Sequence, residues 1–163
     1  MQEVVVLGID PGTAITGYGV VAKRSGGAVS LVECGVIRTS AGRPIADRIR
    51  EIFEEVDGLL LRFSPEVMVV ENVFVGKNVR SALTLGHARG AILLAAALRE
   101  IEIAEYTPAE IKKAVVGTGR ATKDQVGFMV QQQLRLKSPP TPADAADGVA
   151  AALCHCMMGA LSR

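Results

Sequence analysis

Two acidic residues follow apolar runs at points where a sheet could bring them together. Asp10 comes directly after the β-branched run 4–9, and Glu71 comes directly after the run 67–70. Ligands of open α/β sheets bind beyond the carboxyl ends of the strands, so these two carboxylates converge if the two strands are parallel neighbours. The alternative for Asp10 is a plain turn residue, because Asp-Pro-Gly is a common turn sequence.

A second pair of acids, Asp144 and Asp147, is spaced three residues apart and therefore shares one face of a helix. One interpretation is that they cap the helix and complement its N-terminal dipole. However, the segment 148–153 is apolar on all sides, which indicates a buried helix. Buried carboxylates without a nearby base must be protonated or bind a cation, because burying an unpaired charge is costly.

The four acids together form a candidate set of metal ligands. Hard oxygen ligands without a supporting His and Cys framework suit Mg²⁺ or Mn²⁺ better than zinc. Two such ions, about 4 Å apart, can activate a water molecule and stabilise the leaving oxygen of a phosphodiester. We therefore expect two ions per active site and a phosphodiester hydrolase. The expected catalytic residues are Asp10, Glu71, Asp144 and Asp147.

The elements that must position these acids can be read from the hydrophobic pattern. Strands are predicted at 4–9, 17–22, 29–33 with 35–38, 67–70 and 101–106, and helices at 45–60, 81–99, 109–116, 123–134 and from about 143 towards 161. Strands that first form a meander and then alternate with helices predict an α/β fold. The expected architecture is a mixed sheet with helices on both faces.

Length and composition favour one folded domain over residues 1–163. The chain is 49% hydrophobic and 21% charged, and its net charge of +1 leaves room for an acidic site beside a basic rim. Three cysteines form no even framework, and the N-terminus lacks a basic secretory segment. The apolar run 91–98 is much shorter than the ~20 residues that cross a bilayer. We therefore expect a cytoplasmic protein without a membrane partner.

An ordered set of motifs resembles the RuvC Holliday junction resolvases along nearly the whole chain. These motifs lie at 7–13, 16–20, 70–74, 77–78, 81–83, 86–90, 115–119 and 143–147. The resemblance implies an RNase H-like fold with a five-stranded sheet, a homodimer, and paired metal-dependent cuts in four-way DNA junctions during recombination and repair. It also implies a partnership with the RuvA-RuvB branch-migration complex.

The same resemblance assigns DNA contacts to several residues. Lys112 and Lys123 match basic positions that approach the cleaved strand, and Phe74 matches an aromatic residue that contacts bases near the junction centre. Without the resemblance, Phe74 is equally well explained as a core anchor of its loop. Further phosphate contacts are expected from three cations for which a solvated surface role is the alternative, namely Lys77, Arg80 and Arg89.

Other motifs favour structural roles or different classes of protein. Cys154-His155-Cys156 cannot chelate a metal from adjacent helical positions, and Gly117-Thr118-Gly119 lacks the Lys-Ser/Thr ending of a phosphate loop. His87 is also expected to be structural. An ATP-binding protein of the actin and sugar-kinase type shares a motif like 8–13, but it needs two lobes. A junction-binding module without catalysis does not require the four acids.

Overall fold

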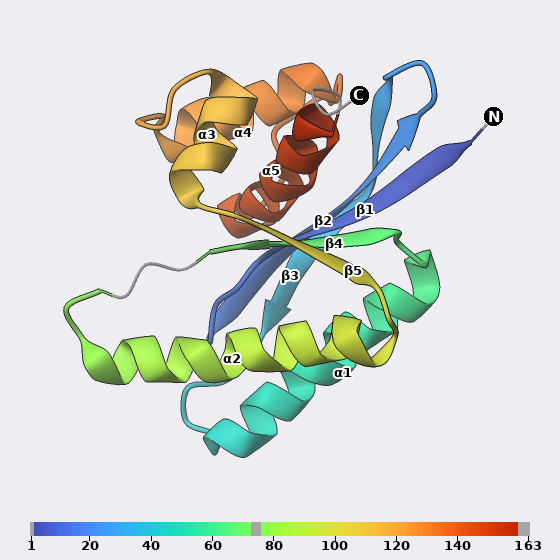
Figure 1. The fold of residues 1–163 in the computed structure, drawn as a ribbon. Coiled ribbons are helices and arrows are strands. Elements are labelled where there is room, and N and C mark those ends of the chain that lie inside the picture. Colours follow the sequence, from blue (N-terminus) through green and yellow to red (C-terminus); the bar gives the residue numbers. More distant parts are fainter. Residues whose placement is uncertain (1, 73–75, 160–163) are drawn as a thin grey trace.

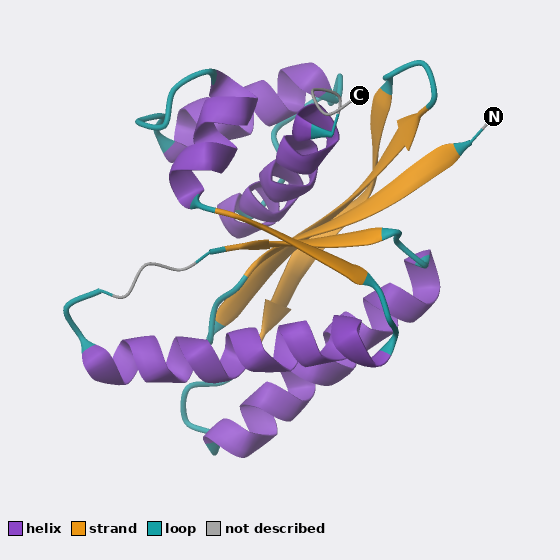
Figure 2. Cartoon of the chain, viewed as in Figure 1, coloured by secondary structure: helices purple, strands orange, loops and turns teal. Residues whose placement is uncertain are grey.

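Five strands and five helices form the part of the chain that the structure describes, residues 2–72 and 76–159 of the computed structural model (Figures 1 and 2). The strands are β1 (Glu3–Asp10), β2 (Ile15–Arg24), β3 (Val29–Arg38), β4 (Val67–Glu71) and β5 (Glu102–Tyr106). The helices are α1 (Ile45–Phe63), α2 (Val79–Leu98), α3 (Pro108–Val116), α4 (Lys123–Gln133) and α5 (Ala143–Met158).

The strands form one mixed sheet in the order β3-β2-β1-β4-β5. β1, β2 and β3 are an antiparallel meander, whereas β4 pairs in parallel with both β1 and β5. The hairpin between β2 and β3 turns at Gly27, whose φ of 85° is readily adopted by glycine. The predicted mixed five-stranded sheet and its order of strands and helices are confirmed.

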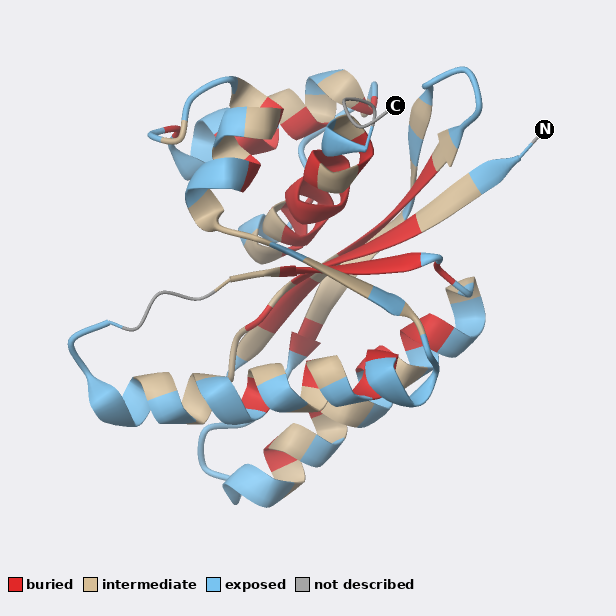
Figure 3. Cartoon of the chain, in the orientation of Figure 1, coloured by how far each residue is buried: buried red, intermediate tan, exposed pale blue. Residues whose placement is uncertain are grey.

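The two faces of the sheet bury different sets of helices, as the purple helices on either side of the orange strands show in Figure 2. Alternate residues of a strand point to opposite faces. On β1, Leu7 and Ile9 pack in one hydrophobic cluster with α1 and α2, while Val6 packs in the other with α3, α4 and α5. Figure 3 shows that burial is concentrated in the central strands and in α5. Helices on both faces are thus confirmed.

The structure differs from the sequence prediction mainly at element ends. The segments 29–33 and 35–38 are one continuous strand, because Cys34 and Gly35 pair with β2 like their neighbours. α1 extends to Phe63 and is ended by Ser64, which has a left-handed backbone. The last described helix ends at Met158, and position 161 lies outside the described residues.

α5 lies backbone to backbone against β1 and β2. A Cβ on Gly8 would come within 2.1 Å of the Gly148 carbonyl oxygen, and a Cβ on Gly148 would come within 2.5 Å of the Tyr18 Cα. Glycine in a strand commonly marks such a close approach of another backbone. The helix that carries Asp144 and Asp147 is therefore seated directly on the strand that ends in Asp10.

α2 has an exposed apolar stripe. Val79, Leu83, Leu94 and Leu98 are between 51% and 68% exposed, although helices that pack on a sheet usually direct such side chains inward. By length and composition alone α2 could cross a membrane, and only 22% of its apolar stretch is buried. An arginine in its middle, Arg89, disfavours a lipid environment.

Candidate active site

Asp10 and Glu71 are the last residues of two neighbouring parallel strands. Ile9 of β1 is in register with Val70 of β4, so the residues that follow leave the sheet at the same edge. The two carboxylates lie near enough to each other that, besides desolvation by burial, the charge of Glu71 raises the pKa of Asp10. The convergence expected from the sequence is confirmed.

Asp144 and Asp147 join this edge from α5. Asp144 lies in the first turn of the helix, and no side chain caps the helix through a hydrogen bond. One carboxylate oxygen from each of Asp10, Asp144 and Asp147 can be chosen so that all three lie within 4.8 Å of one another. The helix dipole favours negative charge at Asp144, but a dipole role does not explain the approach to Asp10.

Burial and mutual repulsion disfavour the ionised form of the cluster. Desolvation, and then the nearby carboxylates of Glu71 and Asp147, raise the pKa of Asp10 to about 8. Desolvation also raises the pKa of Glu71 and of Asp147. Carboxylates in this situation take up protons at neutral pH unless a cation stabilises their charge.

Two lysines extend positive charge towards the acids. The Lys123 ammonium lies 3.6 Å from the Asp147 carboxylate, and this attraction raises the pKa of Lys123. Lys112 on α3 is close enough for its charge to lower the pKa of Glu71, although desolvation outweighs it. Lys123 is the first residue of α4, where the helix dipole disfavours a cation, and Asp147 offsets that cost. The Lys123 side chain is 70% exposed and remains accessible to a ligand.

The chemistry of this donor set fits a hard divalent cation. Mg²⁺ binds oxygen at about 2.1 Å, so ligand oxygens on opposite sides of one ion lie about 4.2 Å apart. The three carboxylate oxygens of Asp10, Asp144 and Asp147 meet this requirement within the 4.8 Å limit. Glu71 lies beside Asp10 but outside this three-oxygen group.

The other predicted contact residues are distributed differently. Lys77 precedes α2 and Arg80 lies in its first turn, and both are exposed. Arg89 instead donates to the Asn72 side chain at 2.9 Å and to the Glu105 carboxylate at 2.7 Å, which ties α2 to the ends of β4 and β5. Its side chain is only 20% exposed. Phe74 lies outside the described residues.

Cys154, His155 and Cys156 lie far along α5 from its acidic end. Both cysteines are buried in the cluster beneath α3 and α4, and the His155 ring nitrogen Nδ1 hydrogen-bonds the Tyr106 hydroxyl at 2.8 Å. The two thiols are free. This agrees with the predicted helix-packing role. His87 is exposed on α2.

Sequence reasoning did not identify the glycines that seat α5 against the strands. Gly17, Gly19 and Gly148 all face backbone or Cα atoms of the opposite element at 2.5 Å or less from an added Cβ. The available signal was the presence of glycines inside an otherwise β-branched strand, which is typical of close backbone approach. These glycines set how closely α5 approaches the strands, and thereby the positions of the acids.

Comparison with known proteins identifies the family. The family model described as crossover junction endodeoxyribonuclease RuvC matches residues 6–155. The crossover junction endodeoxyribonuclease RuvC of Pelotomaculum thermopropionicum is 49% identical over 150 residues, which cover 92% of this chain and 91% of that protein. A relative of the same description from Alkalilimnicola ehrlichii is 52% identical over 150 residues, with 92% and 89% coverage.

Solved structures agree with the sequence comparisons. The Thermus thermophilus RuvC structure superimposes with a TM-score of 0.89 and 37% identity over 96% of both chains. T. thermophilus RuvC in complex with a Holliday junction substrate gives a TM-score of 0.88 and 34% identity, over 97% of this chain and 96% of that one. The expected RNase H-like fold is thereby confirmed. The chain therefore belongs to the RuvC family of crossover junction endodeoxyribonucleases.

Proposed function

We propose that this protein resolves four-way DNA junctions by hydrolysing one phosphodiester bond in each of two strands. The observation that carries the proposal is the cluster formed by Asp10, Asp144 and Asp147, whose ligand oxygens lie within 4.8 Å of one another beside Glu71. The T. thermophilus relative that superimposes on this chain was solved with a Holliday junction substrate, which supports the choice of DNA. The whole chain would act as one nuclease domain.

We propose that the four acids hold two Mg²⁺ or Mn²⁺ ions. Such ions supply a water molecule of lowered pKa and stabilise charge on the reacting phosphate. Asp10 would be shared between the two ions in this arrangement, because, beyond the effect of desolvation, the carboxylates of both Glu71 and Asp147 lie near enough to raise its pKa. Asp144 and Asp147 complete the set from α5.

Lys112 and Lys123 would bind the phosphates next to the scissile bond. Their charges already influence the acid cluster, so a phosphate held between cluster and lysines is within reach of both. Cations that neutralise phosphates dominate the affinity of proteins for DNA. Among the remaining cations, Lys77 and Arg80 are exposed and suited to contact the DNA backbone. We assign Phe74 a base contact near the junction centre.

Arg89 is the least suited of the proposed phosphate ligands, because its guanidinium already binds Asn72 and Glu105. A phosphate contact would use the donors that these two partners leave free. The fixed fork of an arginine carries five N–H donors, so such sharing is compatible with its chemistry.

The protein would act as a homodimer assembled through α2. A resolvase that cuts two strands related by two-fold symmetry needs two active sites, and each chain has one. The exposed stripe of Val79, Leu83, Leu94 and Leu98 is interrupted by Gly86 and Gly90, where an added Cβ meets open space. Small residues at the centre of such a stripe let a second helix approach closely.

We further propose a cytoplasmic enzyme that works with a RuvA-RuvB branch-migration complex in recombination and repair.

A cleavage assay tests the proposed activity. A synthetic four-way junction labelled on each strand in turn is incubated with the protein and Mg²⁺ or Mn²⁺, and a linear duplex with the same arm sequence is the substrate control. We expect paired, symmetric nicks in the junction, none in the duplex, and none in EDTA. Equal cutting of the duplex would contradict junction selectivity, and full cutting in EDTA would contradict the metal centre.

A further inference from the structure

The loop that follows Asp10, residues 11–14, is held by several hydrogen bonds and is called the 11–14 loop below. Three successive carbonyl groups, those of Gly12, Thr13 and Ala14, each accept a hydrogen bond from a residue outside residues 12–14. The Thr16 hydroxyl donates to Gly12 at 2.8 Å, the Thr39 hydroxyl donates to Thr13 at 2.5 Å, and the Thr39 amide donates to Ala14 at 3.0 Å. These bonds restrict the backbone of the loop, because each of the three carbonyls is paired with a protein donor.

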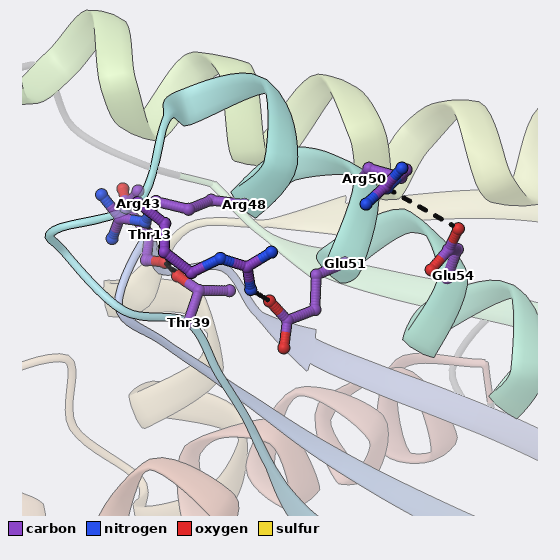
Figure 4. A network of polar contacts seen from close by, with 7 residues as sticks. All are labelled: Thr13, Thr39, Arg43, Arg48, Arg50, Glu51 and Glu54. Atoms are coloured by element: carbon purple, nitrogen blue, oxygen red, sulfur yellow. Dashed lines mark hydrogen bonds and ion pairs between the residues drawn. The ribbon is translucent and has the colours of Figure 1, made fainter.

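Arg48 of α1 adds a further hydrogen bond to this set, through Thr39. Its Nε atom donates to the Thr39 hydroxyl at 3.0 Å, while the same hydroxyl donates to the Thr13 carbonyl (Figure 4). A hydroxyl that accepts from a charged donor becomes a stronger donor itself, because hydrogen bonds in a chain polarise one another. Arg48 and Thr39 thus form a relay from the helix to the loop next to Asp10.

Burying the Arg48 guanidinium at this position costs free energy, and the relay explains why a buried arginine is found there. Its side chain is buried, and within the described residues it forms no ion pair with a carboxylate. It also lies at the N-terminal end of α1, where the helix dipole disfavours a cation. Thr16 and Arg48 are the buried polar residues of the described core, and both act on the 11–14 loop, Thr16 directly and Arg48 through Thr39.

Neighbouring arginines of the same region behave differently. Arg43, which precedes α1, pairs with Glu51 at 2.7 Å, and Arg50 of α1 pairs with Glu54 at 4.0 Å (Figure 4). The side chains of both pairs are exposed. Exposed pairs of this kind contribute little to stability. The contrast shows that Arg48 is distinguished by its contact with the loop and not by its charge alone.

We propose that Arg48 and Thr39 are positioning residues that hold the 11–14 loop and thereby fix the Asp10 carboxylate for cation binding. Asp10 is the last residue of β1 and pairs with Gly17 at the start of the hairpin, so strand pairing holds it from one side only. The relay holds the chain on the other side. This inference rests on the proposed role of Asp10 as a metal ligand.

Thr39→Val tests the relay because it removes the hydroxyl and keeps the shape of the side chain. We expect weaker Mn²⁺ binding, measured by calorimetry without DNA, and a smaller rise in melting temperature when Mn²⁺ is added. Junction cutting should fall roughly 10- to 100-fold, since a displacement of about 1 Å has an effect of this size. Junction affinity should not change. Thr39→Ser, which keeps the hydroxyl, should restore Mn²⁺ binding and cutting.

Arg48→Met should reproduce the Thr39→Val defects, and the double variant should be no worse than the more defective single variant, because both act through one relay. The matched control is Arg50→Met, an exposed arginine of the same helix, which should bind Mn²⁺ and cut normally. Normal Mn²⁺ affinity and cutting per folded molecule in Thr39→Val would overturn the inference, as would an equal defect in Thr39→Ser. Full cutting by Asp10→Asn would instead overturn the proposed metal ligand, whatever the relay variants show.

Discussion

Gly17 on β2 lies so close to Asp144 on α5 that a Cβ at position 17 would come within 1.8 Å of the Asp144 carbonyl oxygen. Gly17 is also the residue that pairs with Asp10 across the β1–β2 hairpin. One glycine therefore contacts the backbone of one candidate ligand and pairs with another. Because glycine has no side chain, α5 can approach β2 this closely at position 17. The geometry of the acid cluster depends on that short distance.

Gly17→Ala should therefore impair the active site more than a surface change of the same size. Neither the strand nor the helix backbone can move aside locally, so α5 must shift away from β2. We expect unfolding to become easier by about 1–3 kcal/mol, which is typical of overpacking. Cutting of a four-way junction should fall by about 100-fold, because catalysis is sensitive to shifts of about 1 Å. Thermal melting and a cleavage assay measure the two effects.

Gly26→Ala is the control for this variant, because a Cβ at that position meets no atom within 4 Å. It should melt and cut like the unmodified protein. If Gly17→Ala cut at the normal rate, the contact with Asp144 would not determine the geometry of the cluster.

Removing the charge of each acid should separate cutting from binding. Asp10→Asn, Glu71→Gln, Asp144→Asn and Asp147→Asn keep nearly the same shape but lose the negative charge that holds divalent ions. We expect cutting to be abolished or severely reduced and junction affinity to be retained, since affinity depends on the cations around the site. In metal-free buffer the variants should melt at equal or higher temperature, because the clustered carboxylates repel one another.

Cleavage gels, junction titrations and metal-free melting curves of the four variants provide the test. Full cutting by Asp10→Asn or Glu71→Gln would contradict the catalytic assignment. Full cutting by Asp144→Asn alone would show that Asp144 is not essential for catalysis, and the assignment of the other three acids would stand.

The sequence predicted the order of the elements and the convergence of the acids because both follow from local patterns. Asp10 and Glu71 each follow an apolar strand, and a parallel pairing of those strands was enough to bring them to one edge. The relay from Arg48 to Thr13 could not be predicted, since it joins a helix to a loop through tertiary contacts. The contact of Arg89 with Glu105 was missed for the same reason.

The exposed stripe of α2 should be the dimer interface, so a charge placed in it should separate the subunits. Leu94→Lys puts an ammonium at a position that is 51% exposed in the single chain and would be buried between two copies. The dimer dissociation constant should rise by at least about tenfold, as for other central interface residues. Sedimentation velocity over a range of protein concentrations measures the change.

Val32→Lys provides a comparison, because Val32 is 49% exposed but lies on β3, away from the stripe. It should sediment like the unmodified protein. A Leu94→Lys protein that remained fully dimeric would exclude this face, and an unmodified protein that stayed monomeric even on junction DNA would exclude the homodimer.

Lys112→Ala and Lys123→Ala should weaken cutting and alter its dependence on salt. Each lysine is proposed to neutralise a phosphate beside the acid cluster, and Lys123 remains accessible at 70% exposure. The slope of log affinity against log salt should decrease in magnitude by about one unit for each full phosphate contact that is lost. Junction titrations at several salt concentrations measure that slope. Unchanged cutting and an unchanged slope would place both lysines away from the DNA.

The raised pKa of Asp10 predicts how stability changes with pH when no divalent cation is present. The value of about 8 in the folded protein exceeds the ordinary value of 3.8, so between these limits the folded state binds more protons than the unfolded state. Stability is therefore highest at the acidic end of this window and decreases as the pH rises through it. Glu71 and Asp147 are shifted in the same direction and strengthen the trend.

Melting curves in EDTA between about pH 5 and pH 8 measure this effect, and Asp10→Asn should flatten the decline because the amide does not titrate. Asp57→Asn is the control: Arg99 lowers the pKa of Asp57, so the stability that Asp57 contributes is lost only at more acidic pH. Saturating Mg²⁺ should reverse the trend, because the ion binds the ionised carboxylates and its affinity rises as they lose their protons. An equally steep decline in the Asp10→Asn protein would mean that groups outside the acid cluster set the pH dependence.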